Sequence, residues 1–175
     1  GYHPFSGKEI WKVAYKGFSS SSRPIIGDGV LYVNTGFGYS SLVAISLGGT
    51  GDLTKSNTLW ENRKSMQARS SQLLIDGLLY IINTGGQAKC IDAKSGEVYW
   101  TERVGRQTSA SPIVTQSKIY TFDEEGHSTI FKPGKTFVLL AENDLPEGCM
   151  ASPAPLDNTL IIRTKNVLYR VGGGG

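Results

Sequence analysis

The sequence predicts an all-β fold, a β-propeller of about four four-stranded blades, on the basis of three observations. Equivalent residues recur along the chain about every 40 residues. The apolar segments are short, rich in β-branched and aromatic residues, and bounded by Gly, Asn, Asp, Ser and Pro. No segment carries apolar residues at helical spacing over three turns. A repeat of this length built only from strands is typical of a propeller blade, which covers its faces by stacking on its neighbours.

Three sets of equivalent positions define the repeat. The first set marks the openings of the units, at Pro24, Gln72, Pro112 and Pro153. The second set marks a strand in each unit, at Tyr32, Tyr80, Tyr120 and Ile161. The third set marks the closing positions, at Trp11, Trp60 and Trp100, with Leu140 at the expected position of a fourth Trp. The first interval is longer because a turn-rich insertion lies at residues 47–53. This insertion lengthens a hairpin and leaves the strands intact.

The repeat divides the chain into blade units in a single array over residues 1–171. We expect these units at about 12–60, 61–100, 101–141 and 149–171, with an extra strand at 8–12 and a glycine tail at 172–175. The last unit lacks its closing hairpin and Trp, so we expect the chain to be part of a larger ring. One alternative stays open, in which the strand at 8–12 supplies the missing outer strand and closes a four-bladed ring.

The closing motif of the second unit carries a family resemblance. Residues 90–100 read Cys-Ile-Asp-Ala-Lys-Ser-Gly-Glu-Val-Tyr-Trp and resemble the pyrroloquinoline-quinone-type (PQQ-like) propeller repeat, Ala-x-Asp-x-x-Thr-Gly-x-x-x-Trp, with Ser95 in place of Thr. The resemblance covers about residues 7–171. It is strongest to secreted bacterial quinone-binding-like propellers and more distant to the propeller lipoprotein of outer-membrane protein assembly. It implies the C-terminal part of a seven- or eight-bladed ring in the periplasm or outside the cell.

Five residues of the repeat are interpreted as structural. Trp11, Trp60 and Trp100 are expected to close their blades by lying across the turn of the next blade. Asp92 offers its carboxylate to backbone N–H groups of the closing turn, and Gly96 supplies the positive φ of that turn. None of the five is therefore assigned to a ligand or cofactor.

Two short segments suggest chemistry but are better explained as turns. Residues 123–127, Asp-Glu-Glu-Gly-His, gather three carboxylates and an imidazole, which suits Ca²⁺ or acid–base work, yet they fall where a solvated hairpin turn is expected. The glycine-rich segments 36–38 and 48–51 precede no helix, which a phosphate-binding loop requires. The sequence therefore supplies neither a catalytic residue nor a metal site.

Three arginines remain as candidate ligand contacts. Arg23, Arg69 and Arg106 each lie shortly before or within a segment that opens a first strand. The first strands of a propeller line its central channel, so we expect these guanidinium groups to be available to an anionic ligand or partner at one end of the ring.

Composition excludes several classes of partner. The net charge is +3 without a basic stripe, which argues against nucleic acid. No apolar run approaches the roughly 20 residues needed to span a bilayer, and no signal peptide is visible. Cys90 and Cys149 are expected to be two independent thiols.

The functional prediction is a non-enzymatic scaffold that binds a protein or peptide partner, through loops at one end of the ring or through an exposed edge strand. The alternative is a fragment of a quinone-dependent dehydrogenase, in which PQQ and Ca²⁺ would be the cofactors. Such enzymes use adjacent cysteines, a Trp platform and a catalytic Asp, and no residue of this chain matches those roles. No cofactor is expected under the scaffold reading, and the sequence identifies no small-molecule ligand.

Overall fold

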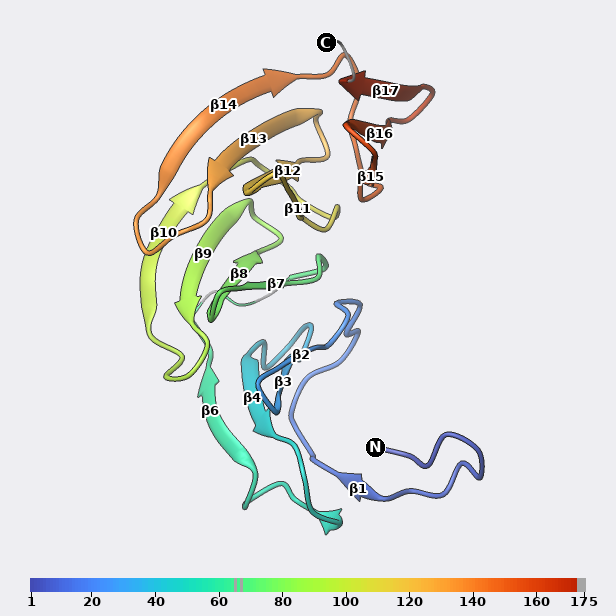
Figure 1. The fold of residues 1–175 in the computed structure, drawn as a ribbon, viewed down its shortest axis with the longest axis vertical. Helices are drawn as coiled ribbons and strands as arrows, with labels where there is room; N and C mark the ends of the chain where they lie inside the picture. Colours follow the sequence, from blue (N-terminus) through green and yellow to red (C-terminus); the bar gives the residue numbers. More distant parts are fainter. Residues whose placement is uncertain (65, 67, 173–175) are drawn as a thin grey trace.

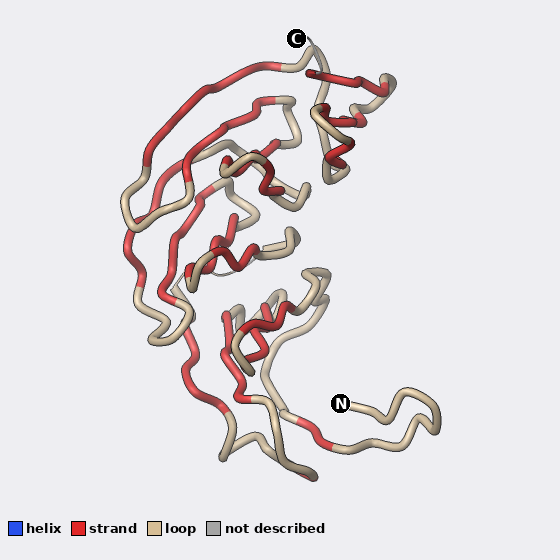
Figure 2. Tube along the Cα trace, viewed as in Figure 1, coloured by secondary structure: helices blue, strands red, loops and turns tan. Residues whose placement is uncertain are grey.

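The computed structural model describes residues 1–64, 66 and 68–172, and the secondary structure of these residues consists of strands. Three four-stranded antiparallel sheets and one three-stranded sheet follow each other along the chain, which confirms the predicted all-β propeller of about four blades. Figure 1 shows them as an open arc with the two chain ends at opposite ends of it. Figure 2 shows the same trace as strands joined by loops and turns.

The blades use their strands in chain order from the concave to the convex side of the arc (Figure 1). Blade 1 contains β2 (Ile25–Gly27), β3 (Val30–Asn34), β4 (Leu42–Ser46) and β6 (Thr58–Asn62). Blade 2 contains β7 (Leu73–Ile75), β8 (Leu78–Ile82), β9 (Gln87–Asp92) and β10 (Val98–Arg103). Blade 3 contains β11 (Ile113–Thr115), β12 (Lys118–Phe122), β13 (His127–Lys132) and β14 (Val138–Asp144). Blade 4 contains β15 (Ala154–Leu156), β16 (Thr159–Arg163) and β17 (Leu168–Gly172).

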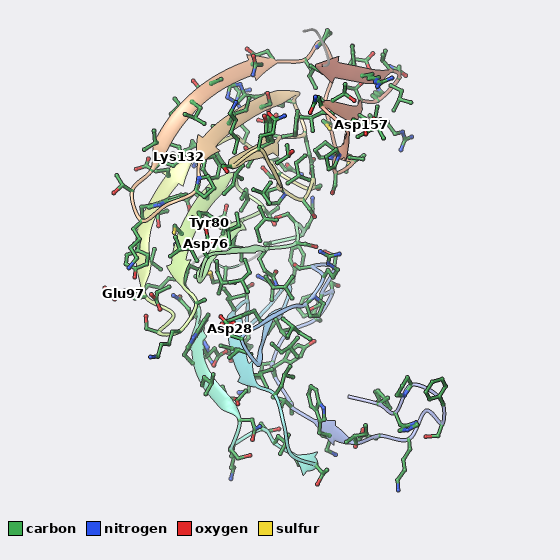
Figure 3. The ribbon with its side chains drawn as sticks, in the orientation of Figure 1. Asp28, Asp76, Tyr80, Glu97, Lys132 and Asp157 are labelled. Atoms are coloured by element: carbon green, nitrogen blue, oxygen red, sulfur yellow. The ribbon has the colours of Figure 1, made fainter. Side chains whose placement is uncertain are left out.

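Tight turns join the first two strands of each blade. In blades 1 and 2 the turn residues are Asp28–Gly29 and Asp76–Gly77, all with positive φ. Paired positive φ values are those of the two-residue turn that matches the twist of a β-hairpin, and Asp–Gly is its preferred sequence. Figure 3 labels Asp28 and Asp76 together with Asp157, the corresponding turn residue of blade 4.

The hydrophobic cores lie between the blades. One cluster joins blades 1 and 2 and includes Leu42, Leu79 and Ile91. Two others join blades 2 and 3, and blades 3 and 4, and a fourth lies on blade 1 with Val13 packed against it. Each sheet therefore depends on its neighbour for the burial of its faces, as expected of a repeat array.

Serine hydroxyls link the openings of the blades. The N–H of Arg23 donates to Oγ of Ser71, the N–H of Ser71 to Oγ of Ser111, and the N–H of Ser111 to Oγ of Ser152, each at 2.9 Å. A backbone donor of each blade is thus satisfied by the next blade along the chain. This ladder aligns the blades at their first strands.

The two ends of the chain are not joined in this structure. The extra strand, β1 (Trp11–Lys12), pairs in parallel with β5 (Gly51–Asp52), which is formed by the insertion in blade 1. The alternative in which residues 8–12 close a four-bladed ring on the last unit is therefore not what the structure shows. β17 includes Gly172, which the sequence analysis assigned to the tail, and the remaining tail residues 173–175 lie outside the described part of the chain.

Two further expectations concern thiols and membrane spans. Cys90 and Cys149 are both free and buried, in different interblade clusters, which confirms two independent thiols. The described part of the chain contains no helix long and apolar enough to cross a membrane.

Candidate functional site

The outer strand of blade 3 presents an open, apolar edge. β14 is seven residues long and pairs on one side with β13, and none of the described strands pairs with its other side. Val138, Leu139 and Leu140 are 44%, 48% and 45% exposed. A long, exposed strand edge with apolar side chains is a template for pairing with another chain.

A β-bulge places Leu140 at the surface. Leu139 pairs with Phe131 and Ala141 pairs with Ile130, so Leu140 is the extra residue between them. Blade 2 has the same irregularity between Val98 and Trp100. The residue at the position of the closing Trp is therefore Ala141, and the assignment of Leu140 to that position was wrong. The closing hairpin of blade 3 is one residue longer than that of blade 2, which a fixed step of 40 residues does not capture.

A charged pocket lies at the C-terminal end of β14. Its volume is about 490 Å³. The lining residues are Arg103, Gly105, Arg106, Asp123, Glu125, His127, Glu142 and Asp144. β14 thus leads from an apolar half to a half in which carboxylates outnumber cationic groups, and the edge and the pocket together are the candidate site.

His127 is held between two carboxylates of β14. Its Nδ1 lies 2.8 Å from Oδ1 of Asp144, and its Nε2 lies 3.4 Å from Oε1 of Glu142. The hydrogen bond to Asp144 raises the pKa of His127, burial lowers it, and Glu142 adds to the rise. The net effect is a pKa above the ordinary value, which favours the imidazolium between the two acids.

Asp123 organises the floor of this pocket. Its Oδ1 accepts from the N–H groups of Glu125 and His127, both at 2.9 Å, and its Oδ2 accepts from the N–H of Arg106 at 3.0 Å. Asp123 is buried, unlike the solvated turn residue expected from the sequence. Its lone pairs are used to fix the turn against the neighbouring blade, so its role is structural.

The three arginines proposed as anion contacts have different surroundings. Arg69 Nη1 lies 3.4 Å from Oε1 of Glu124, and Arg106 forms an ion pair with Glu125. Arg23 instead lines a separate cavity of about 410 Å³ near the first strands, together with Ser71 and other residues. Arg69 and Arg106 are thus already neutralised within the chain, and anion binding by the three arginines stays a prediction that is best directed at Arg23.

The residues interpreted as blade-closing lie at the junctions between blades. Trp60 Nε1 donates to the carbonyl of Ala93 at 3.1 Å, and Trp100 Nε1 donates to the carbonyl of Gly134 at 3.0 Å. In the closing turn of blade 2, Oδ1 of Asp92 accepts from the N–H groups of Lys94 and Ser95. These hydrogen bonds, led by that of Ser95, lower the pKa of Asp92.

Gly96 and Trp11 complete this set, and Gly96 lies at the same junction as Trp60. Gly96 has φ of 76°, and a Cβ there would lie 2.7 Å from Cδ2 of Trp60. Trp11 lies in β1 and is half-buried. Gly96 thus lies where blade 1 meets the closing hairpin of blade 2, whereas Trp11 pairs with Gly51 of the blade 1 insertion.

Val138 and Leu139 were not predicted as site residues, although the absence of a closing Trp from this blade was a sign that its outer surface differs. The hydroxyl groups of Tyr32 and Tyr80 were not predicted as interblade contacts either: Tyr32 donates to the carbonyl of Ala93 at 3.1 Å. Tyr80 accepts from the N–H of Gly134 at 2.8 Å.

The described residues do not fit a quinone and Ca²⁺ site. Ca²⁺ takes about six to eight oxygen ligands, and the described residues contain no group of three or more His, Cys, Asp or Glu side chains that could hold a metal ion. Trp60 and Trp100 are engaged at blade junctions, and the two cysteines lie in different clusters. The candidate site consists of apolar side chains along the edge of β14 and mutually paired polar groups in the pocket.

The stacked four-stranded sheets, the closing hairpins and the open outer edge define a β-propeller of PQQ-like repeats. Residues 51–135 match a family model described as outer membrane protein assembly factor BamB. The chain is thus a β-propeller array that is similar in sequence to BamB over residues 51–135.

Individual relatives agree with this assignment. Outer membrane protein assembly factor BamB of Yersinia pestis is 19% identical over 206 residues, which cover 90% of this chain and 52% of that protein. The crystal structure of BamB from Moraxella catarrhalis has a TM-score of 0.68 and 18% identity, and the match covers 89% of this chain and 46% of that one. The quinohemoprotein alcohol dehydrogenase ADHIIG of Pseudomonas putida HK5 has a TM-score of 0.64 and 16% identity, with 88% of this chain and 30% of that chain covered. The chain therefore spans about half the length of the BamB proteins it matches, and the structural likeness establishes the fold.

Proposed function

We propose that this chain is a non-enzymatic scaffold that binds an extended segment of a partner protein along β14. The observation that carries the proposal is the open edge of β14, with Val138, Leu139 and Leu140 exposed beside unpaired backbone groups. A peptide that adds a strand gains main-chain hydrogen bonds, and its side chains meet alternate residues of the edge.

The charged end of β14 would set the orientation of a peptide bound along this strand. An added strand that passes Val138 and Leu140 reaches Glu142 and Asp144 at the pocket. We therefore expect a segment with apolar residues followed by a basic residue, which the carboxylates would attract.

The relatives support the same class of function. The printed name of the Yersinia pestis relative describes it as an outer membrane protein assembly factor. We propose by extension that this chain works in the periplasm or outside the cell, without a cofactor, and that its partner is a protein. The alternative of a PQQ-dependent dehydrogenase gains no support from the described residues, and reconstitution with PQQ and Ca²⁺ followed by an absorption spectrum tests it directly.

Peptide binding tests strand addition at β14. The probe is a fluorescein-labelled peptide of alternating Val and Thr with a Lys near one end, titrated with the protein and followed by fluorescence anisotropy. We expect saturable binding that Leu140→Lys weakens at least about tenfold, which corresponds to about 1.4 kcal/mol. Leu59→Lys is the matched control because Leu59 is the bulged residue of β6 in blade 1 and is also exposed.

A backbone-modified peptide tests the mode of binding. N-methylation at alternate residues removes the N–H groups that would pair with β14, while the side chains remain. We expect this peptide to lose binding. Equal affinity of the methylated peptide, or equal effects of Leu140→Lys and Leu59→Lys, would contradict strand addition at β14.

A further inference from the structure

The first residues of the chain form a hairpin of the type that closes a blade. The N–H of His3 donates to the carbonyl of Lys8, and the N–H of Gly7 donates to the carbonyl of His3, both at 2.9 Å. The closing hairpin of blade 2, residues 92–97, has the same two bonds at 2.8 Å. The glycine in each turn has a similar positive φ, 68° at Gly7 and 76° in blade 2.

The strand register extends this correspondence. Tyr2 pairs with Glu9 after the N-terminal turn, as Ile91 pairs with Val98 in blade 2. In both hairpins a Trp follows the left-handed glycine by four residues. The segment from residue 1 to Trp11 therefore corresponds to the end of β9, the closing turn and the first part of β10 in blade 2.

Blade 4 has no outer strand among the described residues. β17 pairs with β16, and no strand among the described residues pairs with its other side. Leu160 pairs with Val171 in the same register in which Leu79 pairs with Ile91. Val171 thus occupies in blade 4 the position that Tyr2 occupies in the N-terminal hairpin. Leu168 and Val171 are 69% and 48% exposed at this edge.

A tyrosine of blade 3 also lacks the contact that a closing hairpin provides. Tyr32 and Tyr80 each form a hydrogen bond through the hydroxyl to the closing hairpin of the next blade. Tyr120 is the equivalent residue of blade 3, since it pairs with Ile113 as Tyr80 pairs with Leu73. Within the described structure its hydroxyl has no hydrogen-bond partner.

The N-terminal outer strand is held on one side and open on the other. The carbonyls of Ile10 and Lys12 accept from N–H groups of the blade 1 insertion, at 2.8 and 2.9 Å, and the N–H of Ala14 donates to Oγ1 of Thr54 at 2.8 Å. Gly1 and Tyr2 cover the opposite edge only as far as Trp11. From Lys12 to Ala14 that edge has no strand partner among the described residues.

We propose that two copies of this chain associate reciprocally, with the N-terminal outer strand of each copy completing blade 4 of the other. Transferring the register of blade 2 places Glu9 opposite Val171 of the second copy, Lys12 opposite Tyr169, and Val13 opposite Leu168. Arg170 and Val171 of the second copy take the places of Gly1 and Tyr2. The exchange adds backbone pairing along the whole of β17 and covers its exposed Leu and Val.

A second copy fits the two ends better than closure within one chain. β1 and β17 lie at opposite ends of the open arc in Figure 1. Three interblade cores and the serine ladder fix the curvature that keeps them apart. A two-fold pair satisfies both open edges of both copies at once, because each copy supplies one strand and accepts one.

The mass of the chain in solution is the first test. Gel filtration with light scattering of residues 1–175 is expected to give twice the chain mass of 18.9 kDa. Deletion of residues 1–12 removes the donated strand, and Leu168→Lys with Val171→Lys blocks the accepting edge. Both variants are expected to be folded monomers by circular dichroism, whereas a monomeric unaltered chain would overturn the proposal.

Disulfide trapping tests the register and separates the two kinds of closure. The single variants Lys12→Cys and Tyr169→Cys are mixed in equal amounts and oxidised, and a disulfide-linked pair of the two chains is expected. Lys12→Cys mixed with Arg170→Cys is the matched control, because neighbouring residues of a strand point to opposite faces. In the double variant Lys12→Cys/Tyr169→Cys, a cross-linked single chain would show closure within one copy and overturn the proposal, as would equal trapping in the control mixture.

Discussion

Single residues carry the contacts that join one blade to the next. Trp60 and Trp100 each span a junction through the indole N–H, and Tyr32 and Tyr80 do so through the hydroxyl. The donors and acceptors on the far side are backbone groups of closing hairpins, so they do not depend on side-chain identity there. Substitutions at these positions therefore report on the junctions rather than on the individual sheets.

Gly96→Ala and Gly77→Ala form a matched pair at the residue scale. Both glycines have similar φ, 76° and 73°, but a Cβ at position 96 meets Trp60 Cδ2 at 2.7 Å, whereas none lies within 4 Å at position 77. We expect Gly77→Ala to lower the free energy of unfolding by about 1 kcal/mol through the backbone alone. Gly96→Ala is expected to cost about 2–4 kcal/mol because the indole must also move. Urea denaturation measures both, and equal losses would show that the junction tolerates the displacement.

Substitutions of Trp100 separate the contribution of aromatic packing to stability from that of the indole hydrogen bond. Its ring lies 5.8 Å from Phe131 and 5.1 Å from Phe137 by centroid distance, and its Nε1 binds the carbonyl of Gly134. Trp100→Ala is expected to lower the free energy of unfolding by about 3–5 kcal/mol. Trp100→Phe keeps a ring and is expected to cost about 1–2 kcal/mol, mainly through the lost hydrogen bond. Thermal denaturation followed by circular dichroism distinguishes the two, and a Phe variant as unstable as the Ala variant would argue against the aromatic contacts.

At the scale of elements, the outer strands differ although their topology is the same. β6 and β10 each carry a Trp that docks on the next hairpin, while β14 carries Ala141 at that position and an exposed apolar segment before it. β14 is also longer than either, with seven residues. The length and exposure of β14 distinguish the outer edge of blade 3 from those of blades 1 and 2.

The His127 clamp makes the β13–β14 pair sensitive to pH. Since the folded-state pKa of His127 is raised, mainly by the hydrogen bond to Asp144, its stabilising contribution is complete below the unfolded-state pKa and disappears as the pH rises through the folded-state pKa. We expect the stability difference between the unaltered chain and His127→Gln to be about 0.5 kcal/mol near pH 5 and close to zero near pH 9. Thermal denaturation across this range measures it. A difference that grows with pH would contradict the protonated clamp.

The whole molecule is an array in which each blade contacts only its neighbours. Blade 2 has a neighbour on both sides, and all five residues of β8 are buried, whereas most of β17 is exposed. The burial of each sheet from solvent therefore depends on its place in the arc as much as on its own sequence.

Native-state hydrogen exchange tests this dependence. Local opening costs less where few buried contacts are lost, so we expect the slowest amide exchange in β8 and β9 and the fastest in β17 and the N-terminal hairpin. Mass spectrometry of peptic fragments measures these rates. The reverse order, or uniform exchange over all blades, would show that the array unfolds as a single unit.

The sequence predicted much of the fold because the residues that define the repeat fix strands and turns through neighbours only a few positions away. Pro or Gln at the strand openings recurs in all four blades, the Tyr of the second strand in blades 1 to 3, and the Asp–Gly turn in blades 1 and 2. Each of these features acts over a few residues. The candidate site was less predictable. Leu140 was assigned to the Trp position because sequence spacing does not show which residue is bulged, and Asp123 was expected in solvent although the neighbouring blade buries it.

By itself the sequence determined the class of fold, the strands of each blade and the two independent thiols, since periodicity and turn chemistry depend on residues close in the chain. Only the tertiary structure decided that Arg69 and Arg106 are paired with Glu124 and Glu125, that β1 lies against β5, and that the edges of β14 and β17 are open. These features depend on how blades stack and how far the arc curves. Stacking joins residues that are far apart in the chain, such as Arg69 and Glu124, and no local pattern in the sequence specifies which of them meet.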